Sequence, residues 1–104
     1  MRGDSAFSIE FDHGSRSARL IGELDLGAYE GALEQLLSAF PKPGDVTLDL
    51  SELTFIDSTG IRLLVQLRRA LDDSDRIVLR SPTAPVRKVL EAVGIVDLGF
   101  ELNE

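Results

Sequence analysis

Leu53-Thr54-Phe55-Ile56-Asp57-Ser58-Thr59-Gly60-Ile61-Arg62-Leu63-Leu64 joins an apolar, strand-like segment to an apolar pattern with helical spacing. Three small or polar residues and a glycine separate the two parts, which is typical of a strand-to-helix connection. Ser58 therefore lies at or just before the helix N-terminus, with its hydroxyl near unpaired backbone N–H groups. A serine in this place is most often an N-cap, but the positive end of the helix dipole also favours a phosphate there.

The sequence before this stretch predicts a β-hairpin followed by a helix. Apolar and polar residues alternate from Phe7 to Asp12, which is the period of a half-buried strand. Asp12-His13-Gly14-Ser15 predicts a turn, and 16–21 predicts the returning strand. We expect 22–25 to form a loop in which Asp25 is the candidate N-cap of the next helix.

The first two helices are indicated by apolar spacing. Apolar residues recur at helical intervals from Leu26 to Phe40, which predicts a helix of about 15 residues that ends at Pro41-Lys42-Pro43-Gly44. After a strand at 46–50, a second helix is predicted from Thr59 to Leu71. On this second helix we expect Ile61, Leu64, Leu67 and Leu71 to be in the core, and Leu63 and Ala70 to lie on a flank that faces solvent or a partner.

The C-terminal third of the chain continues the alternation of strands and helices. A short strand is predicted at 76–79, after a turn at 72–75. Thr83 is the candidate cap of a third helix, with Pro85 in its first turn and Gly94 at its C′ position. Phe100 and Leu102 indicate a last strand. We therefore predict an α/β fold in which a mixed sheet has an N-terminal hairpin and helices packed against it.

Length and composition limit what this protein can be. The chain has 104 residues, which suits a single domain spanning 1–104, and its hydrophobic fraction of 43% is enough for one core. There is no cysteine, no apolar run of the roughly 20 residues that span a bilayer, and no signal-peptide block at the N-terminus. We expect a soluble, cytoplasmic protein with no membrane insertion.

Charge argues against direct nucleic acid binding. The net charge is −7, so the phosphates of DNA or RNA would repel the protein. The distribution is uneven, because seven of the eleven basic residues fall between Ile61 and Lys88, together with only three acidic residues. We interpret these basic residues chiefly as solvated helix faces. The alternative is a basic patch beside Ser58 that meets an acidic partner surface.

An enzyme is not expected. With no cysteine and with His13 as the only histidine, Cys–His catalysis and thiolate or multi-histidine metal sites are excluded, and nothing supports a pair between Ser58 and His13. The glycine-rich phosphate loops are absent. Asp57-Ser58-Thr59-Gly60 has one residue more than the Asp-Thr-Gly or Asp-Ser-Gly of aspartic proteases. It also runs into a helical pattern, whereas those proteases are mostly β.

Three segments resemble STAS domains. Val46–Ser51 followed by Leu53–Gly60 resembles the switch segment of that family, most closely that of the bacterial anti-sigma factor antagonists. Leu20–Asp25 is similar to the Gly-Glu-Leu-Asp segment of the family, and Ser81–Leu90 is similar to its short loop and third helix. The segments keep the family's order and cover nearly the whole chain.

The resemblance implies a function as an anti-sigma factor antagonist. Such a protein binds an anti-sigma factor that is also a serine kinase of the GHKL type, and thereby frees the sigma factor for transcription. The kinase phosphorylates the switch serine, here Ser58, which releases the antagonist, and a serine phosphatase resets it. ATP belongs to the partner, so no cofactor is implied for this chain. The partner-binding residues implied by position are Asp25, Asp57, Ser58, Thr59, Gly60, Ile61, Arg62 and Leu63.

A second function within the same family stays open. A STAS domain can be an adaptor subunit of a larger assembly, such as a lipid-transport ABC complex or a stress-signalling scaffold, and Ser58 then need not be phosphorylated. One departure from the family bears on partner contacts. The family usually adds a helix after the last strand, whereas this sequence stops at Glu104, so we expect that helix to be missing or short.

Overall fold

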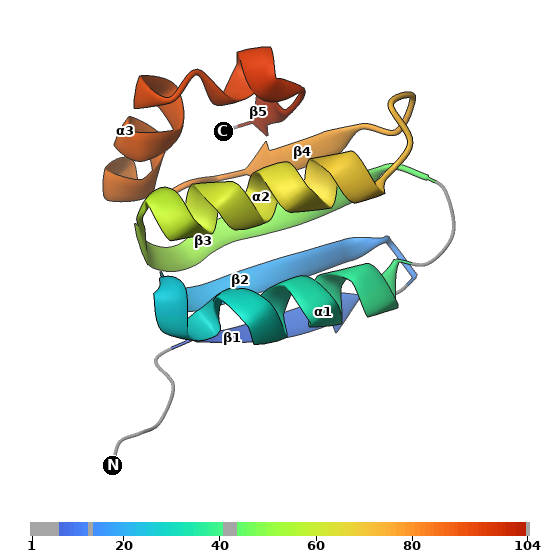
Figure 1. Ribbon diagram of the computed structural model, residues 1–104, viewed down its shortest axis with the longest axis horizontal. Helices are drawn as coiled ribbons and strands as arrows, with labels where there is room; N and C mark the ends of the chain where they lie inside the picture. Colours follow the sequence, from blue (N-terminus) through green and yellow to red (C-terminus); the bar gives the residue numbers. More distant parts are fainter. Residues whose placement is uncertain (1–6, 13, 41–43, 104) are drawn as a thin grey trace.

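A computed structural model describes residues 7–12, 14–40 and 44–103 of the chain. Its sheet has five strands in the spatial order β1-β2-β3-β4-β5 (Figure 1). The first pair is antiparallel and the other three pairs are parallel. The predicted mixed α/β fold with an N-terminal hairpin is therefore confirmed. The strands are β1 (Phe7–Asp12), β2 (Ser17–Leu24), β3 (Val46–Ile56), β4 (Ile77–Arg80) and β5 (Glu101–Asn103).

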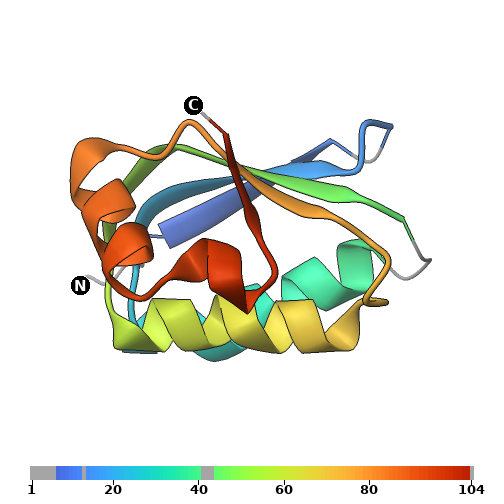
Figure 2. The ribbon, with the colours of Figure 1, turned by 90° about the horizontal axis from the view of Figure 1, so that it is seen from above.

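The helices lie on one side of the sheet. Figure 2 shows α1 and α2 together below one face, with α3 at the end of the sheet near the start of α2. Each parallel crossover is thus made by a helix, as parallel strands require. The helical elements are η1 (Leu26–Ala28), α1 (Tyr29–Ala39), α2 (Ser58–Ala70), α3 (Ala84–Ala92) and η2 (Ile95–Leu98), where η marks a 3₁₀-helix.

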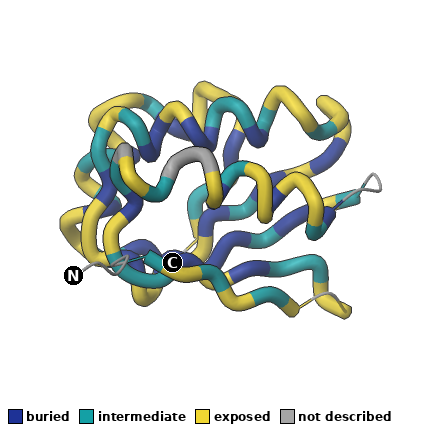
Figure 3. The backbone as a smooth tube through the Cα atoms, turned by 60° about the horizontal axis from the view of Figure 1, so that its bottom comes forward, coloured by how far each residue is buried: buried dark blue, intermediate teal, exposed yellow. Residues whose placement is uncertain are grey.

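A single apolar core fills the space between the sheet and the helices (Figure 3). Strand residues that point to this side, such as Leu20, Leu48 and Leu79, are fully buried. Their neighbours on the opposite side include Arg19, Asp49 and Arg80, which form ion pairs with one another. Ion pairs therefore stabilise the polar face of the sheet, and packing against the helices stabilises its apolar face.

Strand β2 is longer than predicted. The expected loop at 22–25 is wrong, because β2 continues to Leu24 and pairs there with Ile56 of β3. Two register shifts interrupt this pairing, between Arg19 and Ile21 and between Gly22 and Glu23. Gly22 has a φ of 97°, a conformation that glycine adopts at such bulges without strain. The glycine that reads as a loop signal is a bulge inside a strand.

The first predicted helix begins differently from expectation. The segment from Leu26 to Ala28 is a 3₁₀ turn, and the α-helix starts at Tyr29 without a side-chain cap. Asp25 caps the 3₁₀ turn instead, since its Oδ1 accepts the Gly27 N–H at 3.0 Å. The backbone carbonyl of Asp25 also accepts the Ala28 N–H at 3.1 Å. The prediction that Asp25 caps the α-helix itself is wrong, because the 3₁₀ turn lies between Asp25 and the start of α1.

The third helix matches its predicted limits but not its predicted cap. Thr83 occupies the N-cap position, yet its side chain makes no capping bond. Its hydroxyl donates instead to the Leu53 carbonyl of β3 at 2.8 Å, which ties α3 to the sheet. Gly94 has a φ of 69°, and its N–H bonds to the Glu91 carbonyl at 3.1 Å. The predicted glycine C′ position is therefore confirmed.

Candidate functional site

The junction between β3 and α2 is built around the Asp57 side chain. Asp57 is extended, with φ −123° and ψ −168°, and its Oδ1 accepts the N–H groups of Thr59 and Gly60 at 2.9 and 3.1 Å. Its carbonyl accepts the Ile61 N–H at 3.0 Å. Asp57 is therefore the N-cap of α2, and the capping role considered for Ser58 is wrong.

Ser58 is the first residue of α2, and its side chain is exposed. In the part of the chain that the structure describes, its hydroxyl makes no hydrogen bond. Asp57 accepts N–H groups of the first turn of α2 without help from Ser58. The Ser58 hydroxyl is therefore free to react. The predicted position of Ser58 at the helix N-terminus is confirmed.

Gly60 lets α2 start close to the ends of two strands. A Cβ atom at this position would lie 2.5 Å from Ile56 Cγ1 and 2.9 Å from the Leu24 carbonyl oxygen. Neither distance is compatible with a side chain, because atoms in folded proteins are already close-packed. Because Gly60 has no Cβ, the first turn of α2, which begins with Ser58, can lie close to the ends of β2 and β3.

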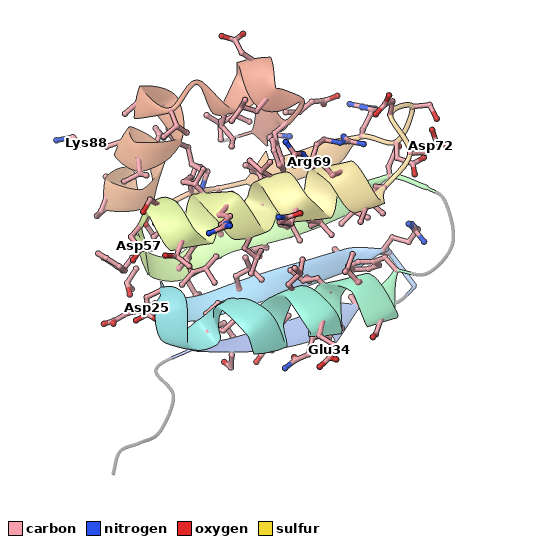
Figure 4. All side chains as sticks on the ribbon, in the orientation of Figure 1. Asp25, Glu34, Asp57, Arg69, Asp72 and Lys88 are labelled. Carbon is pink, nitrogen blue, oxygen red and sulfur yellow. The ribbon has the colours of Figure 1, made fainter. Side chains whose placement is uncertain are left out.

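Asp25 and Asp57 are brought to the same end of the molecule by strand pairing. Each directly follows one member of the Leu24–Ile56 pair of β2 and β3. Figure 4 shows both carboxylates at this end, beside the first turn of α2. Two half-buried carboxylates next to an exposed hydroxyl make this surface negative before any modification.

Of the remaining predicted partner-binding residues, some lie on the surface and the others are buried beneath it. Thr59 is half-buried and Arg62 is exposed, so both can be reached from solvent. Gly60, Ile61 and Leu63 are buried, and Leu63 is completely so. The prediction that Leu63 lies on a flank that faces solvent or a partner is wrong, because its side chain is part of the apolar core and α2 packs against α1. These three residues therefore support the exposed residues of the junction and are not themselves part of the surface.

Two residues at this end were not singled out from the sequence. Glu23 and Phe55 are register partners on β2 and β3, and both are exposed. Phe55 is 46% exposed, which is unusual for a large aromatic side chain. Simple alternation would place Phe55 on the same buried face as Leu53, so the sequence pattern gives no signal that Phe55 is exposed. Phe55 thus adds exposed apolar surface near the acidic residues at this end of the molecule.

The predicted group of basic residues does not form one patch beside Ser58. Arg76 makes a two-pronged ion pair with Glu101 of β5, with N–O distances of 2.6 and 2.7 Å. Arg68 donates to the Gly99 carbonyl, and Arg80 bonds to Asp49 on the sheet. Several of these residues therefore hold the C-terminal half of the fold together.

Metal binding and membrane crossing are two further properties on which the described residues bear. Among residues 7–12, 14–40 and 44–103, no group of three or more His, Cys, Asp or Glu side chains could hold a metal ion. His13 lies outside the described residues, so its distance from Ser58 is not defined. No helix in the described part of the chain has both the length and the apolar character needed to cross a membrane.

Comparison with known proteins identifies the family. A family model described as "Mlab, STAS domain" matches residues 9–100. The chain belongs to the STAS domain family. The STAS resemblance seen in the sequence is thereby confirmed, and the match extends from within β1 to the residue before β5 and includes α1, α2 and α3. Comparison with curated proteins gives no match.

Two solved structures share this fold. The anti-sigma factor antagonist SpoIIAA in its unphosphorylated form is 28% identical, with a TM-score of 0.74, and the match covers 93% of this chain and 87% of that one. A proposed anti-sigma factor antagonist from Thermotoga maritima is 20% identical, with a TM-score of 0.72 over 94% of this chain and 86% of that one. This STAS domain is thus similar to anti-sigma factor antagonists over nearly its full length.

Proposed function

We propose that this STAS domain is an anti-sigma factor antagonist that is switched off by phosphorylation of Ser58. The bare protein binds an anti-sigma factor, which releases a sigma factor for transcription. The observation that carries the proposal is the exposed, unbonded hydroxyl of Ser58 at the first residue of α2. It occurs in a chain similar to an antagonist whose structure is described as its unphosphorylated form.

The partner in this proposal is an anti-sigma factor that is also a GHKL-type serine kinase. It transfers the γ-phosphoryl group of ATP to Ser58 Oγ. A new P–O bond forms, the bond between the β and γ phosphates breaks, the hydroxyl proton is lost to a base, and ADP leaves. A serine phosphatase restores the hydroxyl with water and releases inorganic phosphate. Both reactions belong to partners in the cytoplasm, and this domain contributes the substrate side chain.

The proposed phosphate blocks binding at the surface. It adds a charge of about −1.5 to −2 at neutral pH, together with three oxygens that hold water strongly. Asp25 and Asp57 are already negative at this end, so a partner surface that fits the bare protein meets bulk, repulsion and a desolvation cost. Because Asp57 and not Ser58 caps α2, adding the phosphate breaks no hydrogen bond that holds the helix start.

Affinity capture from the native host tests the function. Wild type, Ser58→Ala and Ser58→Asp serve as baits, and mass spectrometry identifies bound proteins and any phosphate on Ser58. We expect wild type and Ser58→Ala to retain an ATPase-type kinase that Ser58→Asp loses. Ser38→Asp is the matched control, because it adds the same charge on an exposed position of α1. Equal retention by wild type and Ser58→Asp would refute the proposal.

A second candidate function is an adaptor subunit of a larger assembly, such as a lipid-transport ABC complex or a stress-signalling scaffold. The family model favours it, since its description names Mlab and not an anti-sigma factor antagonist. The same capture experiment separates the two functions. An adaptor would bring down the same transporter or scaffold proteins with all baits, and Ser58 would carry no phosphate.

A further inference from the structure

Arg62 lies one helical turn after Ser58 on the surface of α2. Residues four apart on a helix are neighbours, with Cβ atoms about 5–6 Å from each other. Both side chains are exposed. Among the described residues Arg62 makes no hydrogen bond or ion pair, so its guanidinium has no competing partner. It is also the only basic residue in the first two turns of α2, from 58 to 65.

The backbone offers a phosphate on Ser58 little help. The N–H groups of Thr59 and Gly60 are bound to the Asp57 carboxylate, and the Ile61 N–H is bound to the Asp57 carbonyl. A helix N-terminus usually stabilises an anion through such groups, but here they are already used. The Asp57 carboxylate adds a negative charge next to the modified residue. A nearby positive side chain is therefore the protein group best able to stabilise the phosphate.

We propose that Arg62 pairs with the phosphate of phosphorylated Ser58 and acts as the second half of the switch. The proposal rests on the proposed phosphorylation of Ser58. An acidic group placed four residues before a basic one has the favourable order on a helix, and a guanidinium can bind two phosphate oxygens at once. Phosphorylation then changes the docking surface twice. It adds negative charge at Ser58, and it removes the free cation that the bare surface presents at Arg62.

Phosphorus NMR tests this pairing without any kinase. Phosphoserine is incorporated at position 58 during translation of the full chain, and the second pKa of its phosphate is measured by a ³¹P pH titration. Arg62 favours the doubly charged phosphate, so Arg62→Gln should raise this pKa by about 0.3 in low salt, as an exposed pair of this spacing implies. Because salt screens exposed charges, the difference should shrink at 1 M NaCl.

Arg69→Gln is the matched control for the titration. Arg69 is also exposed and, within the described residues, unpaired, but it lies seven residues farther along α2, at the last turn. Its replacement should leave the phosphate pKa at the wild-type value. The proposal is overturned if Arg62→Gln and Arg69→Gln have the same effect, or if neither has any. Because the phosphate is installed directly, this result is independent of whether a kinase modifies Ser58 in the cell.

Discussion

A single hydrogen atom at Gly60 decides how closely α2 can approach the ends of β2 and β3. In Gly60→Ala the new methyl group would meet a backbone oxygen of Leu24 at 2.9 Å, and a backbone atom cannot rotate away. We expect a loss of about 1–3 kcal/mol in the free energy of unfolding, as for other overpacked sites. Urea denaturation of wild type and variant measures it.

Gly31→Ala is the control for that prediction, since it makes the same chemical change on α1 in open space. A Cβ atom at Gly31 has no atom within 4 Å. Alanine is about 1 kcal/mol more favourable than glycine inside a helix, so this variant should be as stable as wild type or more stable. If both variants lose stability equally, the close approach at Gly60 is not what fixes the junction.

At the residue scale, the sequence predicts the place of Ser58 but not its role. Aspartate and serine are both good N-caps, and the two stand side by side at positions 57 and 58. Which of them caps depends on which is the last residue with extended dihedral angles. Leu63 shows the same limit, because the helical pattern places it on a flank, whereas its side chain is fully buried in the core.

At the scale of elements, strand β3 carries a buried carboxylate, Asp49, between the core residues Leu48 and Leu50. Burial of the Asp49 carboxyl acts to raise its pKa, but the Ser51 N–H and hydroxyl, and the guanidinium groups of Arg19 and Arg80, outweigh burial and lower the pKa to about 2. These contacts connect β2, β3 and β4 across the polar face of the sheet. The carboxylate is therefore a link between three strands.

Acid titration tests this link. The pKa of Asp49 is depressed in the folded protein, so its contribution is full above the pKa of the unfolded chain, near 3.8, and is lost as the pH falls towards 2. We expect up to about 2 kcal/mol of unfolding free energy to depend on Asp49 in this window. Asp49→Asn should flatten the pH dependence of the unfolding free energy between pH 5 and pH 2, measured by urea denaturation at each pH. An unchanged slope in Asp49→Asn would contradict the prediction.

Most elements could be predicted from the sequence, whereas their irregular parts could not. Apolar periodicity is sufficient for α2, α3 and the β1–β2 hairpin, because each has one face towards the core. It fails at the end of β2, where the strand continues past Gly22 through two shifts in its pairing register. It fails again at Leu26–Ala28, where a 3₁₀ turn uses the same apolar residues as an α-helix would. Both failures lie next to Asp25, and they set the position of that carboxylate after the end of β2.

At the scale of the whole molecule, the proposed switch leaves the fold intact. The sheet, the core and the cap of α2 are complete without the Ser58 side chain, which is exposed and makes no hydrogen bond in the described part of the structure. A negative charge at the first helical residue is favoured by the helix dipole and opposed by the neighbouring Asp57. These effects nearly cancel, so the unfolding free energy of Ser58→Asp should stay within about 0.5 kcal/mol of wild type.

Two-dimensional ¹H–¹⁵N NMR spectra of wild type and Ser58→Asp, together with their unfolding curves, measure this difference. Shift changes should be confined to the β3–α2 junction, the Asp25 loop and the first turns of α2. The amides of β4 and β5, at the other side of the sheet, should keep their wild-type positions. Changes that spread to these strands, or a large loss of stability, would mean that the charge acts by rearranging the sheet. The switch would then be conformational, and loss of partner binding in Ser58→Asp would no longer indicate that Ser58 itself lies in the interface.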